Sequence, residues 1–165
     1  YDTNPYIADA ATGRKDLALQ SQLYFLESRS DQLGIDKLQA GKPYLSDYVF
    51  DKDPMFARLT LDEGDLEIYA EQLEAVRRQI SAPTVVVYFT GSPARALKQI
   101  RLRNRPYEQN ITLEYLDGLS LEYQNMFDEW TACPVITIDA GEFDCTDQPS
   151  VADLARQIQA YIWKP

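Results

Sequence analysis

A short basic segment stands out in an otherwise acidic chain. The 165 residues carry 16 Lys and Arg against 26 Asp and Glu, a net charge of −10, yet residues 94–107 contain basic residues and no acidic one. The basic residues of this segment are Arg95, Lys98, Arg101, Arg103 and Arg105. Arginine binds oxyanions through a planar guanidinium that keeps its charge. The segment is therefore a candidate lid over phosphate groups, and a solvated helix face is the alternative.

The residues before this segment predict the secondary structure that positions it. A β-branched apolar run at 84–89 predicts a strand, and the turn at 91–93 leads into a helix over 93–105. Ser92 suits the N-cap of that helix, and Pro93 suits its first position. On this helix Lys98, Arg101 and Arg105 share one face, and Pro106 stops it.

The rest of the chain alternates between helical and strand patterns. We expect strands at 43–50 and 134–139, a loop at 51–57, and helices at 17–39, 60–80, 112–130 and 150–162. Gly34 marks a break or kink, while Thr60 and Ser150 are the expected N-caps of their helices. This alternation predicts an α/β fold with a parallel sheet. Three strands are few for such a sheet, so further strands are expected before residue 1.

Ligands of parallel sheets bind at the carboxyl ends of the strands, so the loops at 46–56, 91–92 and 139–141 are expected to converge on one pocket. Asp47 is the best acidic candidate there, with a plain turn residue as the alternative. Phe56 stacks on a base or belongs to the core. The amide of Gln22, or of Gln32, offers both a donor and an acceptor to a base, and solvent exposure is the alternative.

Composition limits the classes of function. The chain has no His, which excludes His-based catalysis and His metal sites, and it has no G-x-x-x-x-G-K-[ST] loop. No apolar run approaches the about 20 residues of a membrane helix. Two Cys do not make a disulfide framework and fit a cytoplasmic protein. The acidic balance argues against non-specific nucleic-acid binding.

Several segments, in their order along the chain, carry a resemblance. They are NPYI at 4–7, LALQSQLYFLESR at 17–29, SDYVFDKDPMFA at 46–57, LTLDEGDLEIY at 59–69, and SP with IRLRNRPYEQNITLEYL within 92–116. Together they resemble the deoxynucleoside kinases, specifically the bacterial deoxyadenosine/deoxyguanosine kinase-like branch. The resemblance implies one domain over 1–165 with a three-layer P-loop kinase fold and a lid at about 93–109. It also implies transfer of the ATP γ-phosphate to the 5′-hydroxyl of a deoxynucleoside, with Mg²⁺, in nucleotide salvage, and a homodimer formed through the helices at 17–39 and 60–80.

The resemblance also implies roles for single residues that bind the substrate. The base-reading Gln of the family falls on Gln22, within Gln22-Leu23-Tyr24-Phe25-Leu26, and the base-stacking Phe falls on Phe56. The acid that holds the sugar 3′-hydroxyl falls on Glu108.

The lid residues of the family match in part. Its catalytic lid arginines, in the pattern R-x-R-x-x-E, fall on Arg103 and Arg105, with Arg101 as a further lid base. The first lid arginine aligns with Gln99, which carries no charge.

Other positions depart from the family pattern. Its [DE]-R-S motif is Ser46-Asp47-Tyr48 here, so the arginine that contacts the 5′-oxygen is missing, and Lys52 is the candidate replacement. The tyrosine that shares the sugar hydroxyl aligns with Ala11. The P-loop and the catalytic Glu are expected before Tyr1. Two alternatives stay open: a non-catalytic kinase-like nucleotide-binding or structural subunit, and a thymidylate kinase-like nucleoside monophosphate kinase.

Overall fold

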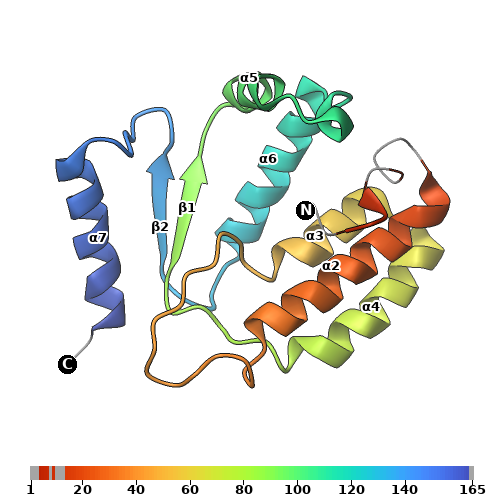
Figure 1. Cartoon of the computed structure of the whole chain (residues 1–165), viewed down its shortest axis with the longest axis horizontal. Helices are drawn as coiled ribbons and strands as arrows, with labels where there is room; N and C mark the ends of the chain where they lie inside the picture. Colours follow the sequence, from red (N-terminus) through yellow and green to blue (C-terminus); the bar gives the residue numbers. More distant parts are fainter. Residues whose placement is uncertain (1–3, 8, 10–13, 164–165) are drawn as a thin grey trace. The chain divides into compact units, whose positions relative to one another are not determined.

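A computed structural model of the chain describes residues 4–7, 9 and 14–163 (Figure 1). The chain divides into two compact units, Tyr1–Ser81 and Ala82–Pro165. The position of Ala11 lies outside the described residues. Within the described ranges, no helix has both the length and the apolar character needed to span a bilayer.

The first unit is built from helices. After a 3₁₀ turn, η1 (Lys15–Leu17), come α2 (Ala18–Leu33), α3 (Lys52–Thr60) and α4 (Glu63–Arg77), and each of the three α-helices packs against the other two. Their buried apolar core consists of Leu26, Phe50, Ala57, Tyr69 and Leu73. Burying such side chains is the main favourable term in folding. The core therefore fixes α2 against α3, the two helices that carry the predicted base-binding residues.

Gly34 ends α2, so the helix predicted over 17–39 is too long at its C-terminal end. The chain turns extended at Gly34 and forms an isolated antiparallel bridge with Ile80. Backbone hydrogen bonds from Ile35 N to the Gln79 oxygen and from Ser81 N to the Leu33 oxygen, both 2.8 Å, close this junction. A side chain at Gly34 would meet the Ser30 carbonyl oxygen at 2.9 Å, so glycine suits this close approach.

The strand predicted at 43–50 is wrong. Residues 42–50 form no ladder, and Leu45 is 100% exposed. Strand backbone needs a hydrogen-bonding neighbour, and the described part of the first unit contains no strand to supply one. The loop predicted at 51–57 is also wrong, because α3 begins at Lys52. Pro54 is tolerated there since the N–H groups of the first helical turn have no intrahelical partner to lose.

The N-cap predicted at Thr60 belongs to another residue. Asp62 caps α4 by accepting a hydrogen bond from Asp65 N at 3.0 Å, and α4 ends at Arg77 instead of continuing to residue 80. Thr60 is the last residue of α3, where its hydroxyl donates to the Phe56 carbonyl oxygen at 2.8 Å.

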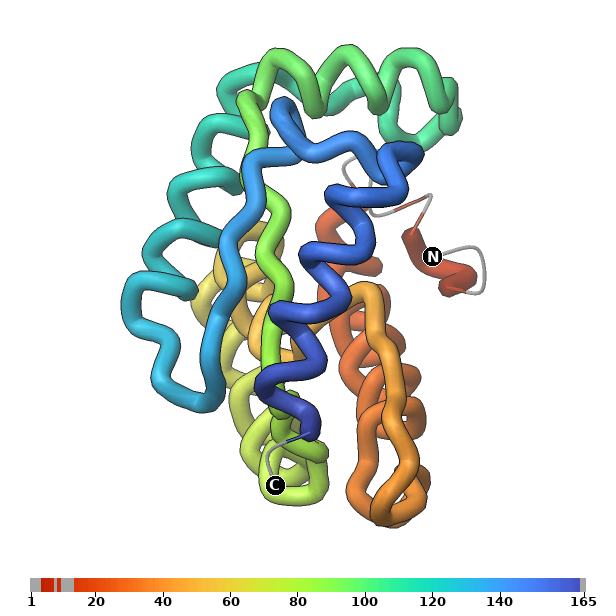
Figure 2. The backbone as a smooth tube through the Cα atoms, turned by 90° about the vertical axis from the view of Figure 1, so that its left-hand side faces the viewer, coloured from red at the N-terminus to blue at the C-terminus, as the bar shows by residue number. Residues whose placement is uncertain are grey.

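The second unit contains two parallel strands, β1 (Val86–Thr90) and β2 (Val135–Asp139), paired from Val86 with Val135 to Thr90 with Asp139. Between them run α5 (Pro93–Arg103), η2 (Pro106–Glu108) and α6 (Leu113–Asp128), and α7 (Gln148–Ile162) follows β2. Figures 1 and 2 both show the strands side by side, and in Figure 1 α6 and α7 lie on opposite sides of them. The α/β class with a parallel sheet flanked by helices is confirmed, with two of the three expected strands.

Helix ends in this unit agree in part with the sequence. Ser92 caps α5 by accepting a hydrogen bond from Arg95 N at 3.3 Å, with Pro93 in the first position, as predicted. The helix ends at Arg103, because Asn104 takes a left-handed conformation with φ 53° and ψ 39°. Arg105 therefore lies outside the helix, and its predicted place on a face with Lys98 and Arg101 is wrong.

The start of α7 also differs from the prediction. The helix begins at Gln148, and its N-cap is Asp147. The Asp147 carboxylate accepts a hydrogen bond from Ser150 N at 3.0 Å, so Ser150 is the donor within the cap rather than the cap itself.

Candidate functional site

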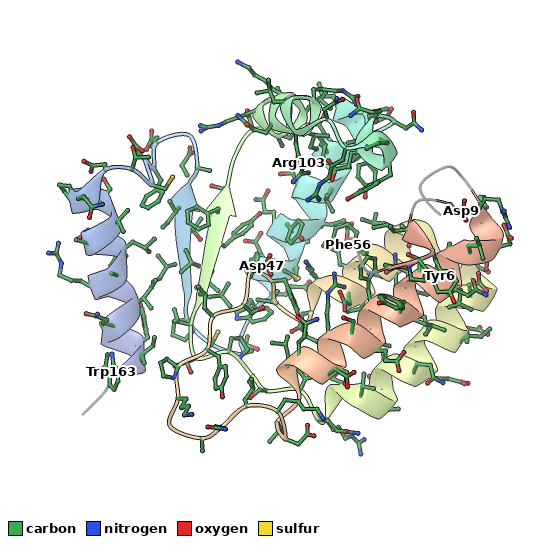
Figure 3. The ribbon with its side chains drawn as sticks, viewed as in Figure 1. Tyr6, Asp9, Asp47, Phe56, Arg103 and Trp163 are labelled. Carbon is green, nitrogen blue, oxygen red and sulfur yellow. The ribbon has the colours of Figure 1, made fainter. Side chains whose placement is uncertain are left out.

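The C-terminal end of α5 carries an ion-pair cluster that joins three predicted site residues. The Arg103 guanidinium donates to the Glu108 carboxylate through Nε at 3.1 Å to Oε2 and through Nη2 at 2.9 Å to each oxygen. Arg105 Nη1 lies 3.7 Å from Glu108 Oε1. Glu108 is 8% exposed, whereas Arg103 is exposed. One buried carboxylate thus faces two guanidinium groups, and Figure 3 marks Arg103 at this end of the helix.

Local sequence explains how Glu108 returns to Arg103. The left-handed Asn104 reverses the chain, and Pro106 then starts η2, which closes with a backbone hydrogen bond from Glu108 N to the Arg105 oxygen at 3.1 Å. The planar fork of arginine matches carboxylate and phosphate geometry alike. The groups that hold Glu108 here are therefore chemically suited to hold a phosphate.

Arg101 makes a different set of contacts. Its Nη1 donates to the Gln109 carbonyl oxygen at 2.5 Å and, more weakly, to the Glu108 carbonyl oxygen at 3.4 Å. Its Nη2 donates to the Ile111 carbonyl oxygen at 2.7 Å. The predicted further lid base thus contacts main-chain carbonyls of the turn.

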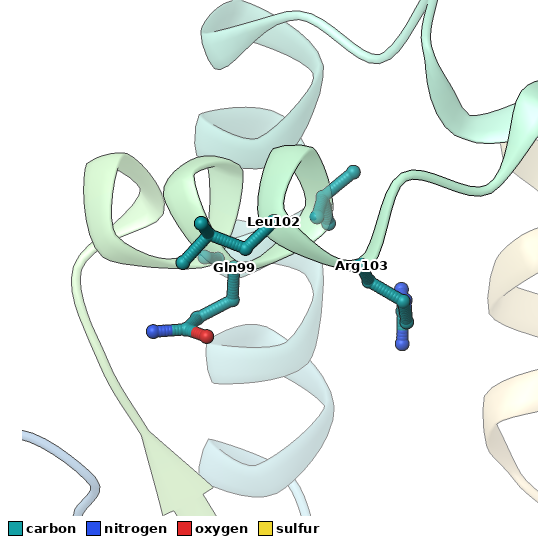
Figure 4. A pocket seen from close by; sticks show the side chains of 5 residues that line it. Gln99, Leu102 and Arg103 are labelled. Carbon is teal, nitrogen blue, oxygen red and sulfur yellow. The ribbon is translucent and has the colours of Figure 1, made fainter.

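A hollow of about 560 Å³ lies on α5 beside this cluster. Its lining residues are Ala96, Gln99, Ile100, Leu102 and Arg103. Gln99 and Arg103, one helical turn apart, project from the same side of the helix (Figure 4). The neutral Gln99 lowers the positive charge of this surface relative to the family pattern.

Two of the three predicted strand-end loops meet in the second unit. Ala140 N donates to the Thr90 oxygen at 2.8 Å, which joins the end of β1 to the residue after β2. A side chain at Gly141 would lie 3.2 Å from Arg95 Nη1 and 2.9 Å from Asp139 Oδ1, so the Arg95 guanidinium stands against this loop. The loop 46–56 belongs to the first unit.

A second hollow, of about 450 Å³, opens between the strands and α6. Thr90 and Thr137 line it from the strands, and Gln124 and Asp128 line it from α6. The lining also includes apolar and aromatic residues, so the space is only partly polar.

In the first unit, Gln22 and Phe56 come together through Thr60. Gln22 Nε2 donates to Thr60 Oγ1 at 3.1 Å, and the same hydroxyl donates to the Phe56 carbonyl oxygen. Both side chains are half-buried. Gln32 instead accepts a hydrogen bond from the Tyr48 hydroxyl at 2.9 Å. These bonds thus link Gln22, rather than Gln32, to the Phe56 backbone through Thr60.

A buried ion pair between α2 and α3 was missed from the sequence. The Arg29 guanidinium donates to Asp53 Oδ1; Arg29 is 8% exposed and Asp53 1%. The guanidinium also lies 4.7 Å from the ring centroid of Phe25 and 5.2 Å from that of Tyr48, within cation–π range. One signal was present: Arg29 follows the core residue Leu26 by three positions, which places it near the apolar face of its helix.

Charge and burial shift two pKa values at this pair. Burial raises the pKa of Asp53 to about 6, against the opposing pull of Arg29 and Lys52. Burial, followed by repulsion from Arg29, lowers the pKa of Lys52 to about 8. The Lys52 ammonium lies 4.8 Å from the Tyr48 ring centroid. The two predicted charged residues of this region differ in exposure. Lys52 is half-buried beside the Arg29–Asp53 pair, whereas Asp47 is exposed in the loop before α3 (Figure 3).

The model of the family described as deoxynucleoside kinase matches residues 2–162. The chain belongs to the deoxynucleoside kinase family. The family predicted from the ordered motifs is thereby confirmed.

Two curated relatives show how similar this chain is to known kinases and how much of their length it covers. A deoxyadenosine kinase of Dictyostelium discoideum is 29% identical over 163 residues, with 95% of this chain and 64% of the relative covered. A deoxyguanosine kinase of Bacillus subtilis is 29% identical over 126 residues, with 74% of this chain and 61% of the relative covered. The chain spans less than two thirds of the length of these kinases.

Solved structures show the deoxynucleoside kinase fold. A deoxyadenosine kinase from M. mycoides with products dCMP and a flexible dCDP bound superposes with a TM-score of 0.78 at 22% identity, covering 96% of this chain and 82% of that one. The same kinase with bound dATP gives a TM-score of 0.75 at 22% identity, covering 95% and 81%. This likeness confirms the predicted fold class.

Proposed function

We propose that this chain forms part of a deoxynucleoside kinase, which transfers the γ-phosphate of ATP to the 5′-hydroxyl of a deoxynucleoside in nucleotide salvage. One observation carries the proposal: in a chain of this family, Arg103 and Arg105 converge on Glu108 at the end of α5. Cations for phosphates and a carboxylate for a sugar hydroxyl are thus gathered in one short segment.

The lid residues divide the chemistry between them. Phosphoryl transfer depends on positioning and on stabilising the charge that develops on the phosphoryl oxygens. Arg103 and Arg105 supply that positive charge, and Glu108 accepts a hydrogen bond from the sugar 3′-hydroxyl. Because Glu108 is bound to Arg103 in this structure, substrate binding exchanges partners: the phosphate takes the guanidinium groups, and the sugar takes the carboxylate.

The first unit supplies the base site. The Gln22 amide pairs with the base edge through its donor and its acceptor, and Phe56 stacks on the base. The Arg29–Asp53 pair ties α2 to α3 and so holds these two side chains at a fixed separation. Lys52 compensates for the missing arginine at the 5′-oxygen, with Asp47 as a nearby countercharge that raises the pKa of Lys52.

The nucleotide and the metal are the least complete part of the site. ATP is the proposed donor, and its phosphates meet the lid arginines; bound Mg²⁺ would supply further positive charge to those phosphates. No group of three metal-ligating side chains occurs in the part of the chain that the structure describes. Magnesium bound to substrate phosphates needs only one or two carboxylates. The sequence contains no phosphate-binding G-x-x-x-x-G-K-[ST] loop, so transfer requires that loop from outside these 165 residues.

Organisation and location complete the proposal. Residues 1–165 form a single kinase domain with the lid at 93–109. Two copies pair through α2 and α4, where Ile68 is 48% exposed although Tyr69 and Leu73 of the same helix are buried. The free thiols Cys133 and Cys145 suit the cytoplasm.

Steady-state kinetics of the intact protein with ATP and a panel of deoxynucleosides tests the function. Arg105→Ala is expected to lower kcat about a hundredfold with little change in nucleoside affinity, on the scale of lost charge stabilisation. Gln22→Ala is expected to weaken nucleoside binding by about 1–3 kcal/mol in calorimetry. Arg156→Ala, which removes an equal charge from exposed α7, is the control. Absence of phosphorylation for every deoxynucleoside would favour the non-catalytic, kinase-like subunit.

A further inference from the structure

The three arginines at the end of α5 do not have one role in common. Arg103 and Arg105 face the carboxylate of Glu108, whereas Arg101 faces the carbonyl oxygens of Glu108, Gln109 and Ile111. These carbonyls belong to the turn that carries the Glu108 side chain. Arg101 is thus the link from α5 to the backbone of that turn.

The turn has few other bonds to hold its shape. Within it, Ile111 N donates to the Glu108 oxygen at 3.1 Å, and Gln109 N donates to the Pro106 oxygen at a long 3.4 Å. The Gln109 amide reaches back to the Arg105 oxygen at 3.0 Å. All of these bonds lie inside residues 105–111. Two side chains of α5 tie the turn to the helix: Arg103 binds the Glu108 carboxylate, and Arg101 binds the main-chain carbonyls.

Arginine is suited to this task where lysine is not. The carbonyl oxygens of Gln109 and Ile111 are bound by two different nitrogens, at 2.5 and 2.7 Å. The planar fork offers both donors in a rigid geometry, whereas lysine offers one ammonium on a flexible stem. Lysine at this position would keep the charge but would offer its donors from a single nitrogen, in place of two nitrogens held in a fixed fork.

We propose that Arg101 is a positioning residue, which holds the 106–111 turn so that the Glu108 carboxylate meets the deoxynucleoside sugar. This rests on the proposed function, in which Glu108 binds that sugar. The role differs from that of a lid base, because the Arg101 guanidinium is directed at the main chain and not at the phosphates. Loss of Arg101 therefore acts on nucleoside affinity, while loss of Arg105 acts on turnover.

The test compares Arg101→Ala, Arg101→Lys and Glu108→Ala in the 165-residue chain and in the intact kinase. Hydrogen exchange of the peptide 106–112 is measured with residues 86–90 as the internal reference. Calorimetry with deoxyadenosine and deoxyguanosine gives affinity, and kinetics gives kcat and KM. We expect both Arg101 variants to speed exchange in 106–112 and to weaken nucleoside binding about tenfold, with kcat nearly unchanged. Arg156→Ala again controls for lost charge.

Each contrary result has a distinct meaning. Unchanged exchange in 106–112 overturns the positioning role outright. Parent-like Arg101→Lys beside an Arg101→Ala variant with lower kcat also overturns it, because charge alone would then suffice, as for a lid base. Faster exchange with unchanged affinity, while Glu108→Ala binds weakly, reduces Arg101 to a structural residue and overturns the proposal. If Glu108→Ala itself binds nucleosides normally, the sugar-binding role of Glu108 fails, and the inference fails with it.

Discussion

The buried Asp53 makes a sharp prediction about stability and pH. Its carboxylate is 1% exposed and paired with Arg29, yet burial outweighs the pair and raises its pKa to about 6. The ordinary value is 3.8. Between these two values the folded chain binds more protons than the unfolded chain. The contribution of Asp53 to stability is therefore present at low pH and is lost as pH rises through this window.

The size of this stability change follows from the folded and unfolded pKa values of Asp53. One pKa unit corresponds to about 1.4 kcal/mol, and the full shift is 6 − 3.8, or about 2 units. Only part of this lies between pH 4.5 and 7, and for that interval linkage gives about 2 kcal/mol. Asp53→Asn cannot titrate. We therefore expect the parent to lose about 2 kcal/mol of stability relative to Asp53→Asn between these two pH values.

Urea unfolding followed by circular dichroism at pH 4.5 and 7 measures this difference. Circular dichroism is needed because both tryptophans, Trp130 and Trp163, lie in the second unit, whereas Asp53 lies in the first. The matched control is Asp51→Asn, which also removes a carboxylate paired with an arginine, but at an exposed position. That control should show a gap below about 1 kcal/mol. A gap for Asp53→Asn that is constant with pH, or one that favours the parent at pH 7, would refute the reasoning.

Two further changes test the packing of the first unit. Arg29→Met leaves the Asp53 carboxylate buried without its partner and should lower the free energy of unfolding in urea by about 3–5 kcal/mol. The control Arg77→Met, from an exposed pair, should lower it by under about 1 kcal/mol. Equal losses for the two variants would contradict a stabilising role for the buried pair. Asp62→Ala should cost about 1 kcal/mol through the lost N-cap of α4, and Thr60→Ala should leave that cap intact, so the reverse order in thermal unfolding would favour Thr60 as the cap.

Most elements of the second unit could be predicted from the sequence, because the residues that determine them are close together in the chain. A β-branched run, a serine cap and a proline at the first helical position all lie within ten residues of one another, and each acts on its own neighbours. The predicted end of α5 was wrong because of the conformation of a single residue. Asn104 takes a left-handed conformation and ends the helix two residues before the expected boundary. The presence of an asparagine in a helical pattern is not enough to predict that conformation.

The first unit was read less well because its outcome depends on distant partners. Whether residues 43–50 form a strand depends on a neighbouring strand and not on their own composition. Thr60 was expected to cap α4, but it is the last residue of α3, and Asp62 caps α4 instead. The Arg29–Asp53 pair joins residues 24 positions apart, so no sequence window contains it. Family resemblance supplied Gln22 and Phe56, but not the bond network that brings them together.

The charges at the end of α5 bear on the proposed lid, whose arginines hold a carboxylate of the same segment. Arg101 is engaged by carbonyl dipoles, so Arg103 and Arg105 share the single charge of Glu108. The cluster of two guanidinium groups and one carboxylate keeps a net positive charge. A terminal phosphate near neutral pH carries close to two negative charges and three acceptor oxygens, so under the proposed function we expect it to compete with Glu108 for the two guanidinium groups. On this proposal, displacement by phosphate would release the carboxylate for a sugar hydroxyl and so couple nucleotide binding to nucleoside binding within one short turn.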